Sequence, residues 1–385
     1  MSSKLSMHRG SQRNHLRTMH ANQGPESSTN LSESRRAALV VGSTGITGGN
    51  LAAHLASTGW IVYGMARKPQ AAPGITPLAA DLQDPAAVRA AIAGVDISHV
   101  FLCTWLRQPT EEENVRVNGA MMENLFGALA GKPIKHAALV TGTKHYLGPF
   151  EAYGQTAAET PFREDNPRLP GLNFYYTQED ILFAAAGRGG FGWSVHRPHT
   201  VIGYARGNAM NMGVTLAVYA TICRETGQPF IFPGSHEQWN ALTDVTDARI
   251  LARQLEWAAT TPAARNHAFN ISNGDIFRWR WLWPQLAGYF GVEPQGPPTP
   301  PAPLEPRMTG AAALWRGIAQ RHSLAEPNID ALVSWWHTDG DLGRKLECLN
   351  DMTQSRSLGF SAFQSTPASF FDLFARLKDE RIIPA

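Results

Sequence analysis

The pattern of apolar and polar positions divides the first 200 residues into short apolar runs and longer stretches of helical periodicity. Helical patterns at residues 85–94 and 112–130 stand between the apolar runs. Strands that alternate with helices in this way are typical of a parallel, doubly wound sheet. Five buried strands are expected: Ala37–Val41, Trp60–Met65, a third that ends before Asp81, residues 97–105, and a fifth that begins at His136 and ends near Gly142. The sequence therefore predicts an α/β fold with a Rossmann-like sheet, whose ligand crevice lies beyond the carboxyl ends of the strands.

Beyond residue 200 the chain becomes rich in aromatic residues and methionine. Residues 328–339 and 369–380 have helical patterns, and the proline-rich stretch 296–306 predicts a surface connector. The alternating tryptophans at 279, 281 and 283 are interpreted mostly as core residues at a helix entry. Met210 and Met212 suit an adaptable apolar pocket, because methionine side chains are flexible and polarisable. This half is expected to be a mostly helical lobe.

Composition changes this picture little. The 385 residues carry a net charge of only +2, which offers no electrostatic case for binding nucleic acid or a membrane surface. No apolar run approaches the roughly 18 residues of a membrane helix. The cysteines are few and far apart, and the histidines lack metal-ligand spacing, so no metal site is expected and a reducing cytoplasm is favoured. The polar residues 1–36 have no apolar periodicity and are expected to be a disordered tail.

A glycine-rich turn follows the first predicted strand. Gly42, Gly45 and Gly48 have GxxGxxG spacing and lead into a helical pattern. In this context the first glycine permits a tight turn, the second lets the backbone approach a pyrophosphate, and the third lets the helix pack close to the strand. The turn therefore predicts a dinucleotide-binding site.

The end of the second predicted strand indicates which dinucleotide is bound. No acidic residue stands there to accept a ribose 2′-hydroxyl; Arg67 and Lys68 stand there instead. Two cations would pair with the additional 2′-phosphate of NADP, so the expected cofactor is NADP(H). Asp81, after the third strand, is expected near the adenine.

The stretch "GLNFYYTQED" (171–180) looks like the tyrosine segment of a short-chain reductase that lacks its lysine. Such enzymes have a lysine four residues after the catalytic tyrosine, but here Glu179 follows Tyr175 and Asp180 follows Tyr176 at that spacing. Lys144 comes just after the fifth predicted strand, beside the crevice. We therefore expect Lys144 to supply the missing cation from a neighbouring segment.

The sequence resembles the progesterone 5β-reductase and iridoid synthase-like enzymes, a divergent branch of the extended short-chain dehydrogenases/reductases. The resemblance rests on these motifs, spread over residues 37–385: "VGSTGITG", "TGTKHYLGPFE" (141–151), "NFYYTQED" (173–180), "WSVHRP" (193–198) and "FNISNGDIFRW" (269–279). It implies NADPH-dependent 1,4-reduction of activated enones and enals. Tyr175 would donate a hydrogen bond to the carbonyl or enolate oxygen, and Lys144 would lower the effective pKa of this tyrosine and touch the nicotinamide ribose.

Further positions match the family's motifs one at a time. Thr44, Gly45 and Ile46 match the phosphate turn, Arg67 and Lys68 the 2′-phosphate clamp, Asp81 and Leu82 the adenine site, Thr104 and Trp105 the end of the fourth strand near the nicotinamide, and Pro198 and Val201 the nicotinamide-side loop. The expected substrate contacts are Trp105, Tyr146, Met210, Met212 and His337. The family often has phenylalanine directly after a WW pair, where this chain has His337, so neither a steroid nor a terpenoid dialdehyde follows as the substrate.

The expected organisation is a disordered tail at 1–36, an NADP-binding Rossmann domain at 37–200, and a substrate-binding lobe at 201–385 that packs on the Rossmann domain and is not independent. Two other functions stay open. A nucleotide-sugar epimerase or dehydratase shares the GxxGxxG turn but keeps tyrosine and lysine on one helix. A non-catalytic NADP(H)-binding regulator would need the turn and Arg67 but no Lys144/Tyr175 pair. The sequence does not determine the natural substrate, the stereochemistry, the pathway or the oligomeric state. A homodimer is one option for the oligomeric state.

Overall fold

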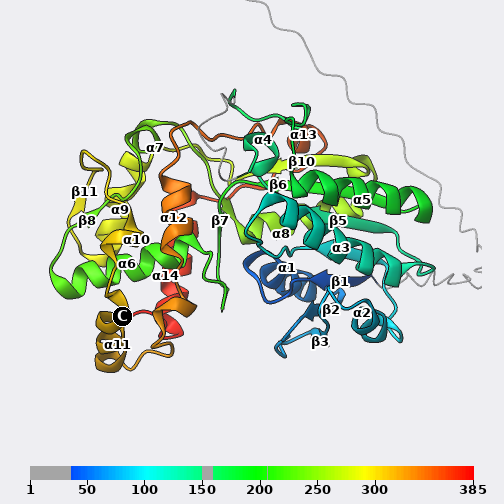
Figure 1. The fold of residues 1–385 in the computed structure, drawn as a ribbon, viewed down its shortest axis with the longest axis horizontal. Coiled ribbons are helices and arrows are strands. Elements are labelled where there is room, and N and C mark those ends of the chain that lie inside the picture. Colours follow the sequence, from blue (N-terminus) through cyan, green and yellow to red (C-terminus); the bar gives the residue numbers. More distant parts are fainter. Residues whose placement is uncertain (1–35, 150–158, 206) are drawn as a thin grey trace, which may run out of the picture. The chain divides into compact units, whose positions relative to one another are not determined.

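Seven parallel strands form the central sheet (Figure 1). The computed structural model describes residues 36–149, 159–205 and 207–385, so the expected tail lies outside the described residues except for Arg36. The strand order is β10 (His267–Ile271), β6 (Gly192–Pro198), β5 (His136–Val140), β4 (His99–Leu102), β1 (Ala37–Val41), β2 (Ile61–Ala66) and β3 (Ile75–Ala79). The order runs outward in both directions from β1, so β1 and β4 flank the switch point where the crevice of a doubly wound sheet opens.

Helices cover both faces of this sheet. Alternate residues of β1 point to opposite faces: Leu39 and Val41 belong to one hydrophobic cluster, and Ala38 and Val40 to another. The first cluster includes residues of α2 (Pro85–Ile92), α3 (Glu111–Leu129) and α5 (Phe174–Gly189), and the second includes residues of α1 (Ile46–Ser57) and α8 (Ala248–Thr260). The predicted α/β fold with a Rossmann-like sheet is confirmed.

The second half of the chain forms a lobe dominated by helices, as expected. Its core contains the fully buried side chains of Trp283, Trp315, Phe370 and Phe374. Two short parallel pairs accompany the helices, β7 (Val201–Ile202) with β9 (Thr246–Asp247) and β8 (Phe230–Ile231) with β11 (Pro294–Gln295). The helices are α6 (Met212–Thr226), α7 (His236–Asn240), α9 (Trp279–Phe290), α10 (Leu304–Arg307), α11 (Ala311–His322), α12 (Trp335–Leu342), α13 (Thr353–Ser357) and α14 (Thr366–Asp379), with single turns of 3-10 helix at Pro262–Ala264 and Ile329–Ala331. Within the described part of the chain, no helix combines the length and the apolar character needed to cross a membrane.

The sheet and the helices that cover it come from both sides of the expected domain boundary at residues 200/201. Strand β10 pairs with β6 at the edge of the sheet, and α8 covers one face beside α1. Both elements lie beyond residue 201 in the chain. The division into 37–200 and 201–385 stays a prediction, and we return to it in the Discussion.

Candidate active site

The glycine turn between β1 and α1 is a close-packed backbone cradle. Gly42 has φ +86°, and a Cβ on it would lie 2.8 Å from the carbonyl oxygen of Cys103. A Cβ on Gly48 would lie 2.3 Å from the carbonyl oxygen of Gly42, which is shorter than any real contact. Gly45 is the N-cap of α1 and supplies no side-chain acceptor to the first amides of the helix. This turn therefore fits an anionic group at the start of a helix.

A pocket opens beside the turn at the carboxyl ends of β1, β2 and β4. It contains many of the positions expected to bind the cofactor: Gly42, Thr44, Arg67, Asp81, Leu82, Thr104 and Trp105. It is also lined by residues that the sequence analysis did not single out: Val41, Met65, Ala66, Ala80, Gln83, Leu106 and Met121. Several of these stand at strand ends, a position from which the topology could have selected them.

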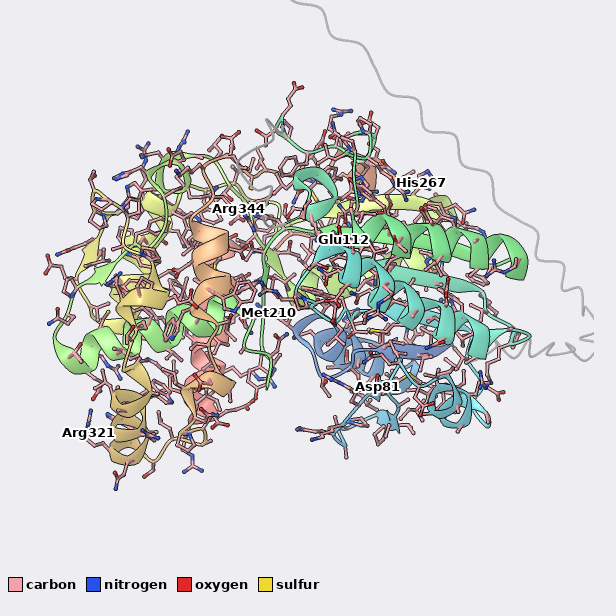
Figure 2. The ribbon with its side chains drawn as sticks, viewed as in Figure 1. Asp81, Glu112, Met210, His267, Arg321 and Arg344 are labelled. Atoms are coloured by element: carbon pink, nitrogen blue, oxygen red, sulfur yellow. The ribbon has the colours of Figure 1, made fainter. Side chains whose placement is uncertain are left out.

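The other expected cofactor residues lie around this pocket rather than in its lining. Gly45, Ile46 and Gly48 belong to the turn and the start of α1, and Lys68 is exposed next to Arg67 after β2. Pro198 ends β6, and Val201 begins β7. Figure 2 shows Asp81 near β2 and β3.

Lys144 begins the short helix α4 (Lys144–Leu147), directly after β5, and its side chain is buried. Its Nζ lies 2.6 Å from Oε2 of Glu111 and 4.6 Å from the centre of the Phe174 ring. Tyr175 is the second residue of α5, and its ring lies 4.5 Å from that of Phe174. Lys144 and Tyr175 are thus brought to the same place by different elements, through their shared neighbours Glu111 and Phe174.

The Tyr175 hydroxyl faces the carboxyl ends of β5 and β6. A Cβ on Gly142 would lie 3.5 Å from the Tyr175 Oη and 3.3 Å from the Pro198 carbonyl oxygen. Among the described residues, the Oη of Tyr175 has no hydrogen-bond partner, Lys144 included. A half-buried phenol that bonds to none of the described side chains is available to a ligand in the crevice.

The pKa of Tyr175 is raised, first by burial and second by the negative charge of Glu111. The expectation that Lys144 lowers this pKa is therefore not met in this structure. The physical reason is that Lys144 is paired with the same carboxylate that acts on the tyrosine. The raised pKa keeps the Tyr175 phenol protonated, so its hydroxyl can donate a hydrogen bond to a ligand.

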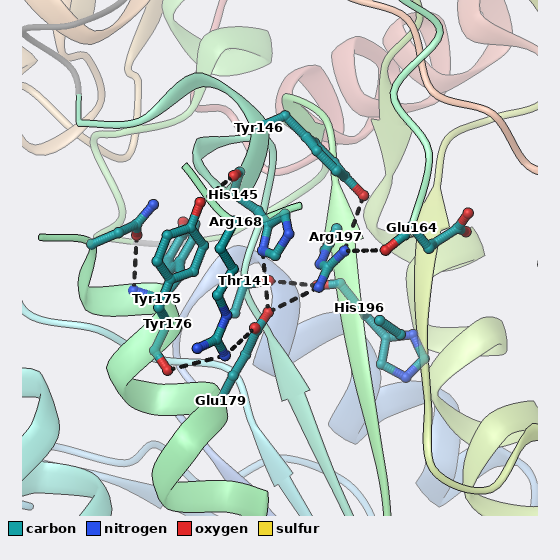
Figure 3. Close-up of polar contacts among 12 residues, drawn as sticks. Thr141, His145, Tyr146, Glu164, Arg168, Tyr175, Tyr176, Glu179, His196 and Arg197 are labelled. Carbon is teal, nitrogen blue, oxygen red and sulfur yellow. Dashed lines mark hydrogen bonds and ion pairs between the residues drawn. The ribbon is translucent and has the colours of Figure 1, made fainter. Parts of the chain in front are cut away.

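Glu179, which occupies the place of the missing lysine one helical turn after Tyr175, belongs to a buried ion network (Figure 3). Its Oε1 accepts a hydrogen bond from Arg197 at 3.2 Å, and its Oε2 accepts one from Arg168 at 2.9 Å. His145 Nδ1 lies 3.4 Å from Oε1. Burial alone would raise the pKa of Glu179, but His145 and Arg197 outweigh it and lower the pKa to about 2. The carboxylate therefore joins α5 to α4 and β6 rather than acting on Tyr175.

The expected substrate contacts separate into two groups. Trp105 lines the pocket and stacks on Phe174, with ring centres 5.3 Å apart, so it lies next to Tyr175 in space. His337 is half-buried on α12, where its neighbour Trp336 lies under the guanidinium of Arg107 at 3.7 Å. Arg107 follows Trp105 by two residues, so α12 comes close to the segment that lines the pocket.

The remaining expected substrate contacts have other surroundings. Tyr146 is 5% exposed, stacks on Phe162, and donates a hydrogen bond to Oδ1 of Asn270 at 2.6 Å. Met212 begins α6 and is 2% exposed in the core of the helical lobe. Met210 is 36% exposed and belongs to the segment that precedes α6. The structure gives Tyr146 and Met212 packing roles that the sequence analysis did not anticipate.

Helix α12 is held near the sheet by a second buried polar cluster. Arg344, just beyond the helix and labelled in Figure 2, pairs with Asp341, and its Nη1 donates to Nε2 of His199 at 2.7 Å. The other ring nitrogen of His199 lies 2.9 Å from Oδ1 of Asp244. Because His199 directly follows β6, the cluster connects the helix that carries His337 to the strand end beside Tyr175.

The sequence analysis missed Glu111. It is the first residue of α3, and its carboxylate contacts Lys144, the backbone N–H of Phe174 and the side chain of Asn114. Three glutamates begin this helix, and acidic residues are common in a first helical turn. Nothing in the sequence alone distinguishes Glu111 from its neighbours.

Comparison with known proteins gives a consistent result. The model of one protein family, described as the PRISE-like Rossmann-fold domain, matches residues 72–384. The chain is 38% identical over 364 residues to (S)-8-oxocitronellyl enol synthase CYC2 of Camptotheca acuminata, covering 90% of this chain and 93% of the relative. It is 37% identical over 361 residues to a 3-oxo-Delta(4,5)-steroid 5-beta-reductase of Arabidopsis thaliana, with the same coverage of 90% and 93%.

Solved structures share the fold at lower identity. MoeE5 in complex with UDP-glucuronic acid and NAD has a TM-score of 0.63 and 18% identity, covering 89% of this chain and 99% of that one. The UDP-glucose 4-epimerase of Thermus thermophilus in complex with NAD has a TM-score of 0.61 and 14% identity, with the same coverage of 89% and 99%. At these identities the likeness is one of fold.

Proposed function

We propose a function from the premise that the chain belongs to the family of PRISE-like Rossmann-fold domains: the protein reduces the C=C bond of activated enones and enals by 1,4-addition, with NADPH as the reductant. Two relatives that are more than a third identical bear names of enzymes acting on such systems, a steroid 5-beta-reductase and an 8-oxocitronellyl enol synthase. The protein is accordingly proposed to be an oxidoreductase acting on CH–CH bonds.

The residues present fit a dinucleotide. The cradle at Gly42 and Gly48 leaves no room for a Cβ, and the uncapped start of α1 offers amide donors to phosphate. Arg67 lies in the pocket lining with Lys68 beside it, which favours a 2′-phosphate, and Asp81 and Leu82 would hold the adenine side. When bound, NADPH supplies the hydride that the β-carbon of the substrate accepts.

Tyr175 is proposed to bind the substrate carbonyl oxygen. As the β-carbon is reduced, negative charge develops on that oxygen, and a hydrogen bond to it becomes stronger than in the ground state. The raised pKa keeps the phenol protonated, so it donates a hydrogen bond without first losing its proton. Lys144, held in the same place, is proposed to contribute positive charge near the developing oxyanion and to bind the nicotinamide ribose.

One observation carries this proposal: the Tyr175 hydroxyl, which has no hydrogen-bond partner among the described residues, lies at the carboxyl ends of β5 and β6, and its ring reaches through Phe174 to the Trp105 that lines the pocket. Trp105 and His337 are proposed to border the substrate, with Met210 and Met212 shaping the surrounding lobe and Tyr146 of α4 packed on Phe162. An epimerase-like function would be expected to have lysine where Glu179 is engaged in the buried ion network.

The proposal is tested by mixing the protein with NADPH and 2-cyclohexen-1-one or progesterone, following cofactor absorbance and identifying the product. We expect a saturated ketone. Tyr175→Phe should lower kcat by about a hundred- to a thousand-fold, because it removes one donor to the oxyanion. Its affinity for NADPH, measured by fluorescence, should stay close to that of the wild type.

Tyr176→Phe is the matched control. It removes the neighbouring hydroxyl, which donates to the carbonyl oxygen of His145 at 2.6 Å. Any effect should appear in the melting temperature rather than in kcat. An inactive wild type, or a Tyr175→Phe variant as fast as the wild type, would refute the proposed function.

A further inference from the structure

Glu111 makes three polar contacts that join three helices. Its Oε2 lies 2.6 Å from Nζ of Lys144 on α4, and its Oε1 accepts a hydrogen bond from the backbone N–H of Phe174, the first residue of α5, at 2.8 Å. On its own helix, Nδ2 of Asn114 donates to Oε2 at 3.2 Å. The carboxylate therefore connects the amino ends of α3 and α5 with the lysine that follows β5.

Glu111 does not cap the amino end of its own helix, α3. The N-cap of α3 is Thr110, whose hydroxyl accepts a hydrogen bond from the backbone N–H of Glu113. Glu112 and Glu113 are exposed in the same first turn, whereas the Glu111 side chain is 13% exposed and points to α4 and α5. A helix-dipole role would be served as well by the two exposed glutamates.

The contacts of Glu111 reach Tyr175 by a short route. Glu111 accepts a hydrogen bond from the backbone N–H of Phe174, and Phe174 directly precedes Tyr175. Asn173, the N-cap of α5, accepts the Tyr175 N–H at 3.1 Å and donates through Nδ2 to the carbonyl oxygen of Lys144, also at 3.1 Å. Two side chains, Glu111 and Asn173, thus fix α4 and the first turn of α5 relative to each other.

We propose that Glu111 is a positioning residue of the reaction, whose carboxylate holds the Lys144 ammonium and the amino end of the Tyr175 helix in one arrangement. This rests on the proposed enone reduction. Its charge has a second consequence, because together with burial it raises the pKa of Tyr175 and so keeps the phenol in its donating form. Glu111 itself is not proposed to touch substrate or cofactor.

The decisive variant is Glu111→Gln. Glutamine keeps an oxygen for the Phe174 N–H but removes the charge that pairs with Lys144. We expect kcat to fall by about ten- to a hundred-fold, since small displacements of catalytic groups are that costly. KM for the enone should change much less. Glu111→Asp, which keeps the charge on a shorter side chain, should recover part of the rate, and Glu112→Gln from the same helical turn should match the wild type.

A double-variant cycle tests whether Glu111 acts through Lys144. If it does, Glu111→Gln/Lys144→Met should be no more than about threefold slower than Lys144→Met alone, because residues that work as a unit are not additive. Multiplied effects of the two substitutions would overturn the proposal, as would a Glu111→Gln variant with wild-type kcat.

A readout without turnover separates this inference from the proposed function. Acetylation of each lysine by acetic anhydride, followed by mass spectrometry on the cofactor-free protein, reports how firmly Lys144 is held, with exposed Lys68 as an internal reference. Lys144 should react several-fold faster in Glu111→Gln than in the wild type. Unchanged reactivity would defeat the inference even if enones are reduced. If Lys144 reacts faster in the variant but the protein reduces no enone, the Glu111–Lys144 pairing is supported and only the proposed reaction is refuted.

If Glu111→Gln lowers the melting temperature sharply, Glu111→Asp carries the same comparisons. Partial recovery of kcat and near-normal Lys144 reactivity in the aspartate variant would support the proposal. An aspartate variant that melts like the wild type and is still as slow as the glutamine variant would contradict it.

Discussion

At the scale of single residues, Gly48 is the most closely packed glycine of the turn between β1 and α1. A Cβ on Gly48 would lie 2.3 Å from the carbonyl oxygen of Gly42, so any side chain there would have to displace the turn that precedes α1. We predict that Gly48→Ala weakens NADPH binding at least tenfold and destabilises the protein by about 1–3 kcal/mol, the usual cost of overpacking. Fluorescence titration and urea unfolding measure the two effects.

Gly127→Ala is the matched control for this prediction. Gly127 lies in α3, is exposed, and a Cβ on it would meet no atom within 4 Å. Alanine there should stabilise the helix by about 0.5–1 kcal/mol and leave cofactor affinity unchanged. Equal affinities of the Gly48→Ala and Gly127→Ala proteins would show that the turn does not hold the dinucleotide.

At this scale a site residue can be predicted from the sequence where its residue type itself indicates a function. A glycine spacing after a strand, or a cation pair after the next strand, indicates a ligand because few other residues could serve there. Glu111 has no such signature, since a glutamate in a first helical turn is ordinary. Its role depends on α4 and α5 arriving beside it, which only the tertiary structure determines. Tyr146 shows the reverse: it belongs to a conspicuous motif, yet its hydroxyl is engaged with Asn270.

At the scale of elements, three neighbouring strands each bury a histidine in the sheet. His99 on β4 stands opposite His136 on β5, and His136 and His196 of β6 both contact the hydroxyl of Ser194 at 2.9 Å. Burial lowers their pKa values to about 4, 3 and 4 respectively. All three are therefore neutral in the folded protein at neutral pH.

These histidines make stability depend on pH. Their folded pKa values lie below the ordinary 6.5, so as the pH falls below 6.5 the unfolded chain takes up protons that the folded protein does not. We predict that the free energy of unfolding decreases between pH 6.5 and 4.5, by on the order of 1.4 kcal/mol for each pKa unit traversed by each group. Glu179, with its pKa lowered to about 2, adds a further loss only below its ordinary pKa of 4.5.

Urea unfolding at pH 7 and pH 4.5 checks this prediction. His136→Gln should be less stable than the wild type at pH 7 but lose less stability on acidification. His236→Gln, which removes an exposed histidine on α7, should follow the wild-type slope. Parallel pH slopes for all three proteins would rule out the buried histidines as the cause.

Element boundaries near the amino end could be predicted because local pattern dominates there. Strand β1 spans Ala37–Val41 as expected, and α3 begins one residue before the predicted stretch. The helical pattern predicted at 328–339 is divided in the structure: a 3-10 turn at Ile329–Ala331 is followed by α12 from Trp335. Asn328 and Ser334 each begin a new segment, and an apolar periodicity that continues across such a break cannot reveal it. Neither β6 nor β10 was predicted as a strand, because buried polar residues such as His196, Arg197 and Asn270 interrupt their apolar runs.

At the scale of the whole molecule, the expected boundary at residues 200/201 separates parts that depend on each other. We predict that a fragment of residues 36–200 does not unfold cooperatively and does not bind NADPH, whereas residues 36–385 do both. The fragment lacks β10, and it lacks the apolar residues Ile250, Leu251 and Leu255 of α8, which cover one face of the sheet with α1. Calorimetry and fluorescence titration measure the two properties, and a fragment with a sharp transition would establish an independent domain.

The position of β10 has a consequence for how the protein is made. During synthesis the chain emerges from its amino end, and the strands from β1 to β6 are released well before β10. Until then the outer side of β6 presents unpaired amide and carbonyl groups. One face of the nascent sheet also stays partly uncovered until α8 has been synthesised. The ribosome must therefore release α6, α7 and α8 of the second half before the chain can complete its central sheet, and chaperones would meet this chain at that incomplete edge.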